Sequence, residues 1–419
     1  MERNDLICAS QYGFRKKHST EYASLHLVDI LNYQLDSRKT PLNIYLDLSK
    51  AFDCLNHNIL LKKLNFYGIS GISLNLISSY LQNRKQYVLY DTTCSDLRNI
   101  KHGVPQGSIL GPLLFLIYIN DLPSASSFFK FLMYADDTTL YCCTDSITSL
   151  NKEEIINNEL ENVNRWLVSN KLSLNVKKTK YMIFHKHDNS VTDLNISMNN
   201  VSISRVQNFN FLGLHLTSNL TWNTHVQEIS KKLSRVIGIL YKLQSYFPRR
   251  ILLSLYNTMM LPHINYCLLS WGKQSNNILK LQKKAVRIIT TSEYLAHTEP
   301  IFKNLQVLKV NDIYNYKLLI FYHNLSNNNS PKYFENFIPE LSRGNNRYAF
   351  RNPQYQIPKY EHMYIKLTCR FQLPQLLNSF MASDLNDGDH ESDSYLSIIM
   401  KNIENVSLPS FRKIVKSYF

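Results

Sequence analysis

Three aspartates in this chain occupy positions where a carboxylate needs a specific reason to be. Asp47 ends an apolar, strand-like run, from which a carboxylate is usually excluded unless it has a partner. Asp136 and Asp137 are adjacent and interrupt two β-rich runs, as at the tip of a hairpin. Because adjacent like charges repel, a turn that gathers carboxylates is best explained by a divalent cation. Taken singly, the vicinal pair is more often a solvated turn, and Asp47 is equally well a strand end or a helix N-cap.

A third segment, GVPQGSILGP at residues 103–112, lies between these aspartates and precedes an apolar helix pattern. Pro-Gln-Gly by itself is ordinary turn chemistry. The informative feature is the order of the three segments along the chain.

The elements that must position these segments alternate irregularly. Helix-period patterns predict helices at residues 21–36, 56–67 and 149–167, and in the last of these Ile155, Ile156, Leu160, Val163 and Trp166 share one face. Strand-like runs occur at 42–48, 128–134, 138–143, 181–185 and 209–216. This mixture predicts an α+β fold. From about Thr221 onward helical patterns dominate, so we expect a domain change there, with loops at 326–331 and 384–394.

Composition narrows the class of protein further. The 419 residues carry 47 Lys and Arg against 32 Asp and Glu, a net charge of +15. Hydrophobic residues make up 44%, which excludes wholesale disorder. The basic balance predicts a polyanionic partner, with nucleic acid as the first candidate and an acidic membrane surface as the second.

Cysteines and apolar runs bear on the compartment. The seven cysteines form no C-x-x-C pair, which favours neither a zinc module nor a disulfide scaffold. The N-terminus lacks the apolar core of a secretory signal, and the longest apolar run, 109–119, is too short to cross a bilayer. We therefore expect an intracellular, soluble protein with no membrane partner.

Six ordered segments together resemble the reverse transcriptase family, and within it the jockey-like group of non-LTR retrotransposons. They are QYGFRKKHST at 11–20, YLDLSKAFD at 45–53 with His57 after it, GVPQGSILGP at 103–112, YADD at 134–137, NKLSLNVKKTK at 170–180 and FLGLHLTSNLTWNTH at 211–225. Segments 262–271 and 280–287 look like the C-terminal region of the same elements. The resemblance covers nearly the whole chain.

The resemblance implies a right-hand polymerase architecture, with an antiparallel palm sheet and packed helices. Residues 1–222 would form partial fingers and the palm, 223–300 a helical, nucleic-acid-binding thumb, and 301–419 a helical C-terminal extension of retrotransposon type. It also implies that the chain begins inside the fingers, so that the missing upstream fingers would impair activity. By the same resemblance, the chain lacks the endonuclease of complete elements. Nuclear residence is expected by resemblance, although no compact basic signal stands out.

The implied activity is RNA-directed DNA polymerisation, which joins a dNTP to a primer 3′-hydroxyl on an RNA template. Two Mg²⁺ ions, or Mn²⁺ as a substitute, suit this chemistry because hard cations prefer carboxylate and phosphate oxygens. By resemblance, Asp47 and Asp136 would bridge the ions, Asp137 would be the third acidic member and the backbone oxygen of Leu48 an extra ligand.

Four more residues receive roles by the same resemblance. Phe52 matches the steric gate that favours dNTP over rNTP, although a core aromatic at this position is the plain alternative. Gln106 would contact the incoming nucleotide beside its sugar, and Gly107 would let the backbone approach the nascent base pair. Lys178 matches the lysine suggested to protonate the leaving pyrophosphate, but it lies in a charge run with neighbouring lysines.

A basic stretch supports a nucleic-acid partner. Eleven Lys and Arg side chains against three Glu give residues 223–300 a net charge of +8. Basic helices with interleaved aromatics suit a surface that follows a duplex backbone, although a solvated basic face is the simpler alternative. The residues expected to contact nucleic acid are Arg15, Lys231, Lys232, Arg235, Lys283, Lys284 and Arg287.

Two other classes of function stay open at this point. The chain is alternatively a catalytically inactive nucleic-acid-binding remnant of a mobile element, or, less consistently with its C-terminal segment, a host-domesticated splicing or telomere factor. Magnesium-dependent primer extension separates the enzyme from the remnant.

Overall fold

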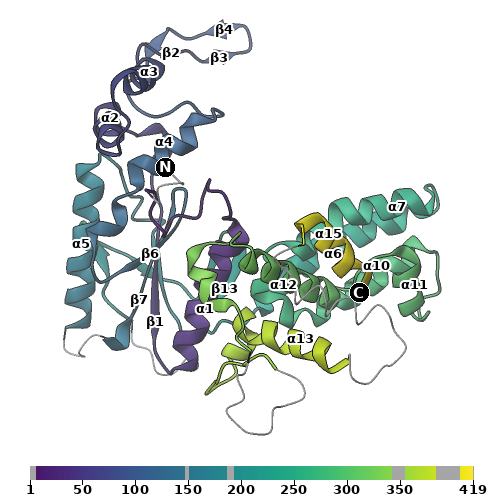
Figure 1. The fold of residues 1–419 in the computed structure, drawn as a ribbon. Helices are drawn as coiled ribbons and strands as arrows, with labels where there is room; N and C mark the ends of the chain where they lie inside the picture. Colours follow the sequence, from purple (N-terminus) through teal and green to yellow (C-terminus); the bar gives the residue numbers. More distant parts are fainter. Residues whose placement is uncertain (1–5, 147–150, 186–192, 342–353, 384–405, 419) are drawn as a thin grey trace. The chain divides into compact units, whose positions relative to one another are not determined.

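The computed structural model describes residues 6–146, 151–185, 193–341, 354–383 and 406–418. The chain divides into two compact units (Figure 1). Unit 1 comprises Met1–Ala23 and Lys39–Gln207, and unit 2 comprises Ser24–Arg38 and Asn208–Phe419. The chain passes from one unit to the other within helix α1 (Thr20–Asp36).

Unit 1 combines strands and helices, which confirms the predicted α+β class. Its helices are α2 (His57–Phe66), α3 (Gly71–Leu81), α4 (Leu110–Ile119) and α5 (Lys152–Ser169), with 3₁₀ turns η2 (Ala51–Asp53), η3 (Leu122–Ala125) and η4 (Thr144–Ser146). Its strands are β1 (Pro41–Leu46), β2 (Lys85–Gln86), β3 (Leu89–Tyr90), β4 (Thr93–Cys94), β5 (Arg98–Asn99), β6 (Lys130–Tyr134), β7 (Asp137–Cys143), β8 (Lys180–Ile183), β9 (Ser197–Met198), β10 (Val201–Ser202) and β11 (Ser204–Arg205).

Five strands form the central sheet, in the order β11-β8-β1-β7-β6. Strand β1 lies in the middle and pairs antiparallel with both β7 and β8. All six of its residues are buried, as expected for a short apolar strand with neighbours on both edges. Asp47, the residue that follows β1, therefore lies at one end of the sheet, on its central strand.

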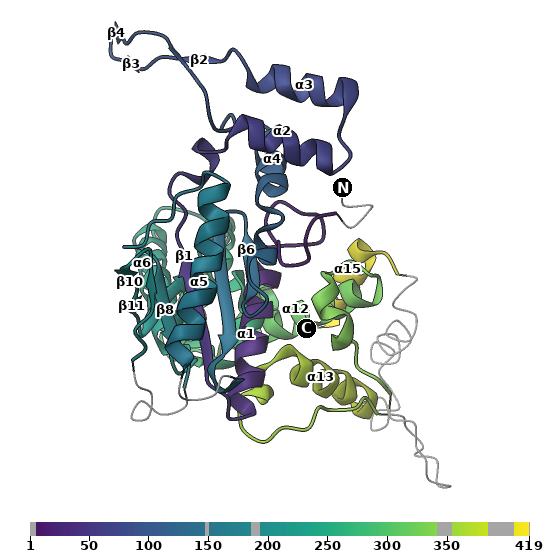
Figure 2. The ribbon, with the colours of Figure 1, turned by 90° about the vertical axis from the view of Figure 1, so that its left-hand side faces the viewer.

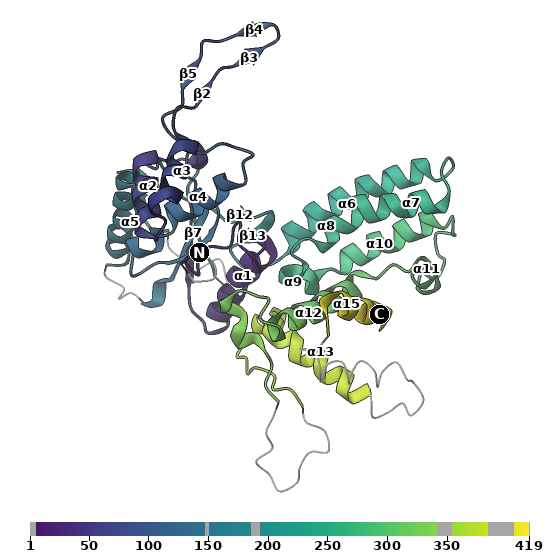
Figure 3. The same cartoon turned by 45° about the horizontal axis from the view of Figure 1, so that its top comes forward.

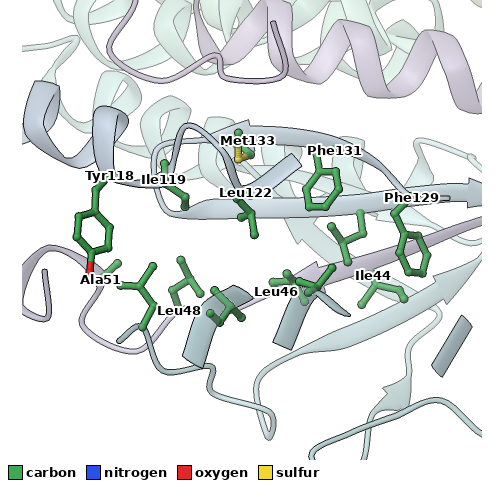
Figure 4. Packing of buried hydrophobic residues seen from close by; sticks show 14 of the residues in the cluster. Ile44, Leu46, Leu48, Ala51, Tyr118, Ile119, Leu122, Phe129, Phe131 and Met133 are labelled. Carbon is green, nitrogen blue, oxygen red and sulfur yellow. The ribbon is translucent and has the colours of Figure 1, made fainter. Parts of the chain in front are cut away.

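Helices α4 and α5 supply much of the apolar packing of unit 1. Helix α4 is hydrophobic almost all round, and residues 114–119 are buried in the core. The predicted face of α5 is confirmed, because Ile156, Leu160 and Val163 are fully buried. Figure 2 shows α5 lying along the sheet, and Figure 4 shows side chains of α4 and the following turn packed with those of β1 and β6.

A narrow β-ribbon extends beyond α3 (Figure 2). It consists of the pairs β2–β5 and β3–β4, and every residue of these four strands is exposed. The sequence pattern indicates no element here, because each strand of the ribbon is only two residues long.

Most predicted elements of unit 1 are confirmed within a few residues. The helix predicted at 56–67 is α2, and the Asn56 side chain caps it by accepting a hydrogen bond from the Ile59 amide. The helix predicted at 149–167 is α5, although its predicted start lies outside the described residues. The strands predicted at 42–48, 128–134, 138–143 and 181–185 are β1, β6, β7 and β8.

The single strand predicted at 209–216 is wrong. The segment forms a hairpin, β12 (Asn208–Phe211) paired with β13 (Leu214–Thr217). Its two-residue turn has positive φ at both Leu212 and Gly213, as a tight hairpin of this kind requires. The period-two pattern runs through the turn, so alternation alone did not reveal the reversal.

Unit 2 contains this hairpin and the C-terminal helices. They are α6 (Asn223–Leu243), α7 (Arg249–Leu255), the π-helical turn η6 (Tyr256–Met260), α8 (Leu261–Asn265), α9 (Leu268–Trp271), α10 (Asn276–Ile289), α11 (Glu299–Leu305), α12 (Val310–Ser326), α13 (Cys369–Ser383) and α15 (Leu408–Tyr418), with 3₁₀ turns η7 (Gly272–Gln274), η8 (Lys332–Phe337) and η9 (Ile365–Leu367). Figure 3 shows α6, α7 and α10 side by side.

The helical prediction for this region is confirmed, because past Thr217 the described residues form helices and no further named strand. The loop predicted at 326–331 separates α12 from η8, and the loop predicted at 384–394 lies outside the described residues. In the part of the chain that the structure describes, no helix is long and apolar enough to cross a membrane.

Candidate active site

The strand register of the central sheet brings the predicted carboxylates together. Leu46 of β1 pairs with Thr138 of β7, so one further step along this register brings Asp47 beside Asp137. Strands β6 and β7 form a hairpin in which Tyr134 pairs with Asp137, and Ala135 and Asp136 make its two-residue turn. Aspartates far apart in sequence therefore share one end of the sheet.

The electrostatic surroundings of Asp137 include both of the other carboxylates. Partial desolvation raises the pKa of Asp137, and the negative charges of Asp136 and Asp47 raise it further. None of the ion pairs formed among the described residues uses any of the three side chains.

A metal ion at this end of the sheet would need ligands besides these side chains. Within the described ranges, no three His, Cys, Asp or Glu side chains form a group that could hold a metal ion by themselves. Magnesium ordinarily takes one or two carboxylates and completes its shell with water and substrate phosphates. An all-oxygen, incompletely closed donor set fits that ion.

The backbone around Asp47 is held by the segment that follows α5. The amide of Asn175 donates to the Asp47 carbonyl at 2.8 Å, and the amide of Asp47 donates to the Thr179 hydroxyl at 3.4 Å. Leu48 forms an antiparallel bridge with Leu174 whose hydrogen bonds use the flanking residues, so this bridge leaves the Leu48 carbonyl unused. Lys178 is exposed and adjoins Thr179, on the segment bonded to Asp47.

Phe52 is half-buried in the turn η2, only five residues beyond Asp47. Its ring stacks on Phe115 of α4 at 4.4 Å between centroids and meets Phe14 edge-on at 6.5 Å. The stack on Phe115 thus holds one face of the Phe52 ring, and part of the side chain is exposed. It packs against the core and is still partly open to a ligand.

The Pro-Gln-Gly loop is bonded directly to this turn. The Val104 amide donates to the Phe52 carbonyl at 3.0 Å, and the Gln106 Nε2 donates to Asp53 Oδ1 at 2.9 Å. Gly107 is exposed, has φ of +78°, and has open space where a Cβ would lie. The structure therefore brings Gln106 and Phe52, predicted from separate segments, onto one surface.

His57 and Arg15 hold the chain's own backbone. His57 begins α2, and its Nε2 donates to the Gly103 carbonyl at 2.7 Å. The Arg15 Nη1 donates to the carbonyls of Cys8 and Gln11 at 2.9 and 3.0 Å. Arg15 thus has a structural use, and its predicted contact with nucleic acid stays a prediction.

The other basic residues predicted to contact nucleic acid belong to α6 and α10 of unit 2, which pack against each other. Lys232, Arg235 and Lys284 are exposed, and Lys283 is half-buried. Lys231 forms an ion pair with Glu228 at 2.6 Å, and the Arg287 Nε donates to the Ala296 carbonyl at 3.0 Å. The exposed members therefore belong to two helices that pack against each other.

Sequence reasoning missed two residues that support the site. The Thr179 hydroxyl accepts a hydrogen bond from the Asp47 amide. The Gln11 side chain accepts one from the amide of Ala135, which precedes Asp136 in the turn. Both lie in segments that carried the resemblance, which was the only signal available, because each interaction joins residues more than 120 positions apart.

The chain matches known proteins over much of its length. The profile of a family described as "Reverse transcriptase (RNA-dependent DNA polymerase)" matches residues 1–216. The chain is 26% identical over 318 residues to the RNA-directed DNA polymerase from mobile element jockey of Drosophila melanogaster, covering 72% of this chain and 34% of that protein. The jockey polymerase of Drosophila funebris is 27% identical, with the same coverages.

A further curated relative is the probable RNA-directed DNA polymerase from transposon X-element of Drosophila melanogaster, 26% identical over 74% of this chain and 35% of that protein. The chain thus spans about a third of the length of these curated relatives. Among solved structures, telomerase from Candida albicans in complex with a fragment of telomeric RNA is 14% identical, with a TM-score of 0.41, covering 72% of this chain and 55% of that chain.

Proposed function

The chain belongs to the reverse transcriptase family, and we propose that it is an RNA-directed DNA polymerase of a non-LTR retrotransposon. In this proposal it joins a dNTP to the 3′-hydroxyl of a DNA primer on an RNA template. The observation that carries the proposal is the strand register that gathers Asp47, Asp136 and Asp137 without an ion pair among the described residues. The match to retrotransposon polymerases supports the choice of substrate.

Asp47 and Asp136 would hold two Mg²⁺ ions, with Asp137 and the Leu48 carbonyl as further oxygen ligands and Mn²⁺ as a substitute. When bound, such ions activate the attacking oxygen and neutralise the charge that develops on the leaving one. The chain itself would contribute the placement of these oxygens, since the β6–β7 hairpin carries Asp136 and Asp137, and β1 with the 173–179 segment holds the backbone at Asp47 and Leu48.

Other side chains would act on the nucleotide. The exposed part of the Phe52 ring would collide with a ribose 2′-hydroxyl, and its stack on Phe115 keeps it from swinging away. Gln106 would contact the sugar, oriented by its bond to Asp53, and Gly107 would let the base pair approach the backbone. Lys178, which is exposed, would donate a proton to the leaving pyrophosphate.

The basic surface on α6 and α10 would bind the phosphates of the template and primer, through counterion release and without reading sequence. We keep the division proposed from sequence, with fingers and palm at 1–222, thumb at 223–300 and an extension at 301–419. Residence in the nucleus, where chromosomal DNA would prime synthesis, is part of the same proposal.

Primer extension on poly(rA)/oligo(dT) tests the proposal. The chain should extend the primer only with Mg²⁺ or Mn²⁺. Asp136→Asn, which removes the charge and keeps the shape, should lower the rate at least about 100-fold, because metal stabilisation of the transition state is worth several kcal/mol. Asp96→Asn in the exposed β-ribbon is the matched control and should keep the wild-type rate.

The rival, a non-catalytic remnant, predicts a different result. Salt-sensitive binding of the duplex without extension in either metal would reject the polymerase and favour the remnant. Equal rates for Asp136→Asn and Asp96→Asn would reject the assignment of the site.

A further inference from the structure

The turn that carries Asp136 has an unusual backbone. Ala135 has φ of +55°, in the left-handed region, while Asp136 is not among the residues with positive φ. A two-residue hairpin turn of this kind normally places glycine at its first position. An alanine resists this conformation, so something outside the turn must hold it there.

One buried side chain binds both backbone groups of this alanine. Gln11 is 1% exposed, and its Oε1 accepts the Ala135 amide at 3.0 Å while its Nε2 donates to the Ala135 carbonyl at 3.4 Å. The same Oε1 accepts the Gly13 amide at 2.7 Å, which fixes the orientation of the side-chain amide. Gln11 therefore holds the orientation of the two peptide groups that flank Ala135.

The segment that carries Gln11 is itself fixed against β6. The Tyr12 amide donates to the Met133 carbonyl at 2.7 Å, and the Met133 amide donates to the Ser10 carbonyl at 2.8 Å, so that Gln11 forms a parallel bridge with Met133. A Cβ on Gly13 would lie 2.4 Å from the Ala135 nitrogen, so only glycine permits this approach. Any shift of the turn would thus break contacts on two sides.

We infer that Gln11 is a positioning residue for the catalytic turn: its amide holds Ala135 in the left-handed conformation and thereby sets where the Asp136 carboxylate stands relative to Asp47. The inference rests on the proposed polymerase function. Asp136 directly follows Ala135, so a rotation of the Ala135 peptide moves that carboxylate. Partners that orient metal-binding groups commonly contribute about 10–100-fold to metal affinity or activity.

The plain alternative is that Gln11 only stabilises the fold. Asn120 is the matched control, because it is a buried amide that also binds two backbone groups of the N-terminal segment. Its Oδ1 accepts the Cys8 amide at 2.8 Å and its Nδ2 donates to the Leu6 carbonyl at 2.7 Å. Within the described part of the chain, the Asn120 side chain bonds to Cys8, Leu6 and Tyr67, none of which belongs to the turn, so it shares the structural role and lacks the positioning one.

The experiment compares Gln11→Leu and Asn120→Leu in the full chain, with Gln11→Glu as an isosteric variant in case Gln11→Leu does not fold. Thermal unfolding reports stability, and Mn²⁺ binding in the presence of primer–template, followed by electron paramagnetic resonance, reports the site without requiring turnover. Primer extension gives kcat and the dNTP KM. Wild-type chain and Asp136→Asn define the Asp136-dependent part of the Mn²⁺ signal.

We expect both Gln11 variants to weaken Asp136-dependent Mn²⁺ binding and to lower kcat by about 10–100-fold, with the dNTP KM changed less than about threefold. Asn120→Leu should lose stability and keep Mn²⁺ affinity within about twofold of wild type. Equal Mn²⁺ affinity in the Gln11 and Asn120 variants overturns the inference, as does the absence of Asp136-dependent Mn²⁺ binding in the wild-type chain. Intact Mn²⁺ effects without any primer extension would instead reject the polymerase proposal alone.

Discussion

Replacing Gly103 by alanine should damage the loop that carries Gln106. Gly103 has φ of +84°, and a Cβ there would lie 2.7 Å from the Asp53 carbonyl oxygen and 2.9 Å from its carbonyl carbon and Cα. The Gly103 amide donates to the Leu55 carbonyl at 2.8 Å, and its own carbonyl accepts from His57. Gly103 therefore joins the loop to the segment that connects η2 with α2.

The cost has two parts. A left-handed conformation costs an alanine about 1–2 kcal/mol. Forcing a methyl group into a filled space costs about 1–3 kcal/mol more, because the obstructing atoms belong to the Asp53 backbone and cannot rotate away. Gly103→Ala should thus lower the free energy of unfolding of unit 1 by about 2–5 kcal/mol.

Gly68→Ala measures the first part alone, so the difference between the two variants gives the second part. Gly68 has nearly the same φ, +87°, and nothing lies within 4 Å of its ideal Cβ. Its cost should be about 1–2 kcal/mol. Urea denaturation, with native-state hydrogen exchange of β1 and α4 amides to localise the loss to unit 1, measures both variants. Equal destabilisation by the two would refute the reasoning, since the Asp53 contact would then contribute nothing.

Two further predictions follow from contacts already described. Phe52→Val should raise ribonucleotide incorporation in primer extension, because the ring that stacks on Phe115 is removed; an unchanged dNTP/rNTP ratio would reject the gate. Burial, together with the positive charges of His215 and Lys232, lowers the pKa of His225 from 6.5 to about 4. Folding therefore favours the neutral form of His225. The free energy of unfolding should fall as the pH drops from 6.5 toward 4, by about 3 kcal/mol in all. His225→Gln should remove that part of the pH dependence, which urea denaturation at pH 7 and pH 4.5 measures. An equal change in the free energy of unfolding between the two pH values, in the wild-type chain and in the variant, would contradict this prediction.

The sequence was sufficient for the features that depend on local pattern. The apolar run before Asp47 formed β1, the helical face containing Ile156 and Leu160 was buried, and the helix predicted at 56–67 formed as α2. The ordered segments identified the family, and the match to residues 1–216 bears that out. These features are encoded within a few residues of one another, so periodicity and motif spacing reveal them.

The tertiary structure alone decided which distant groups meet. The β1–β7 register placed Asp47 beside Asp137, and a one-residue slip would have turned every side chain of β1 to the other face. The turn at Leu212 and Gly213 divided an alternating run into two strands. The side-chain amide of Gln11 forms hydrogen bonds with the backbone of Ala135. Each of these depends on pairing and packing between segments remote in sequence, whose free energies no local window contains.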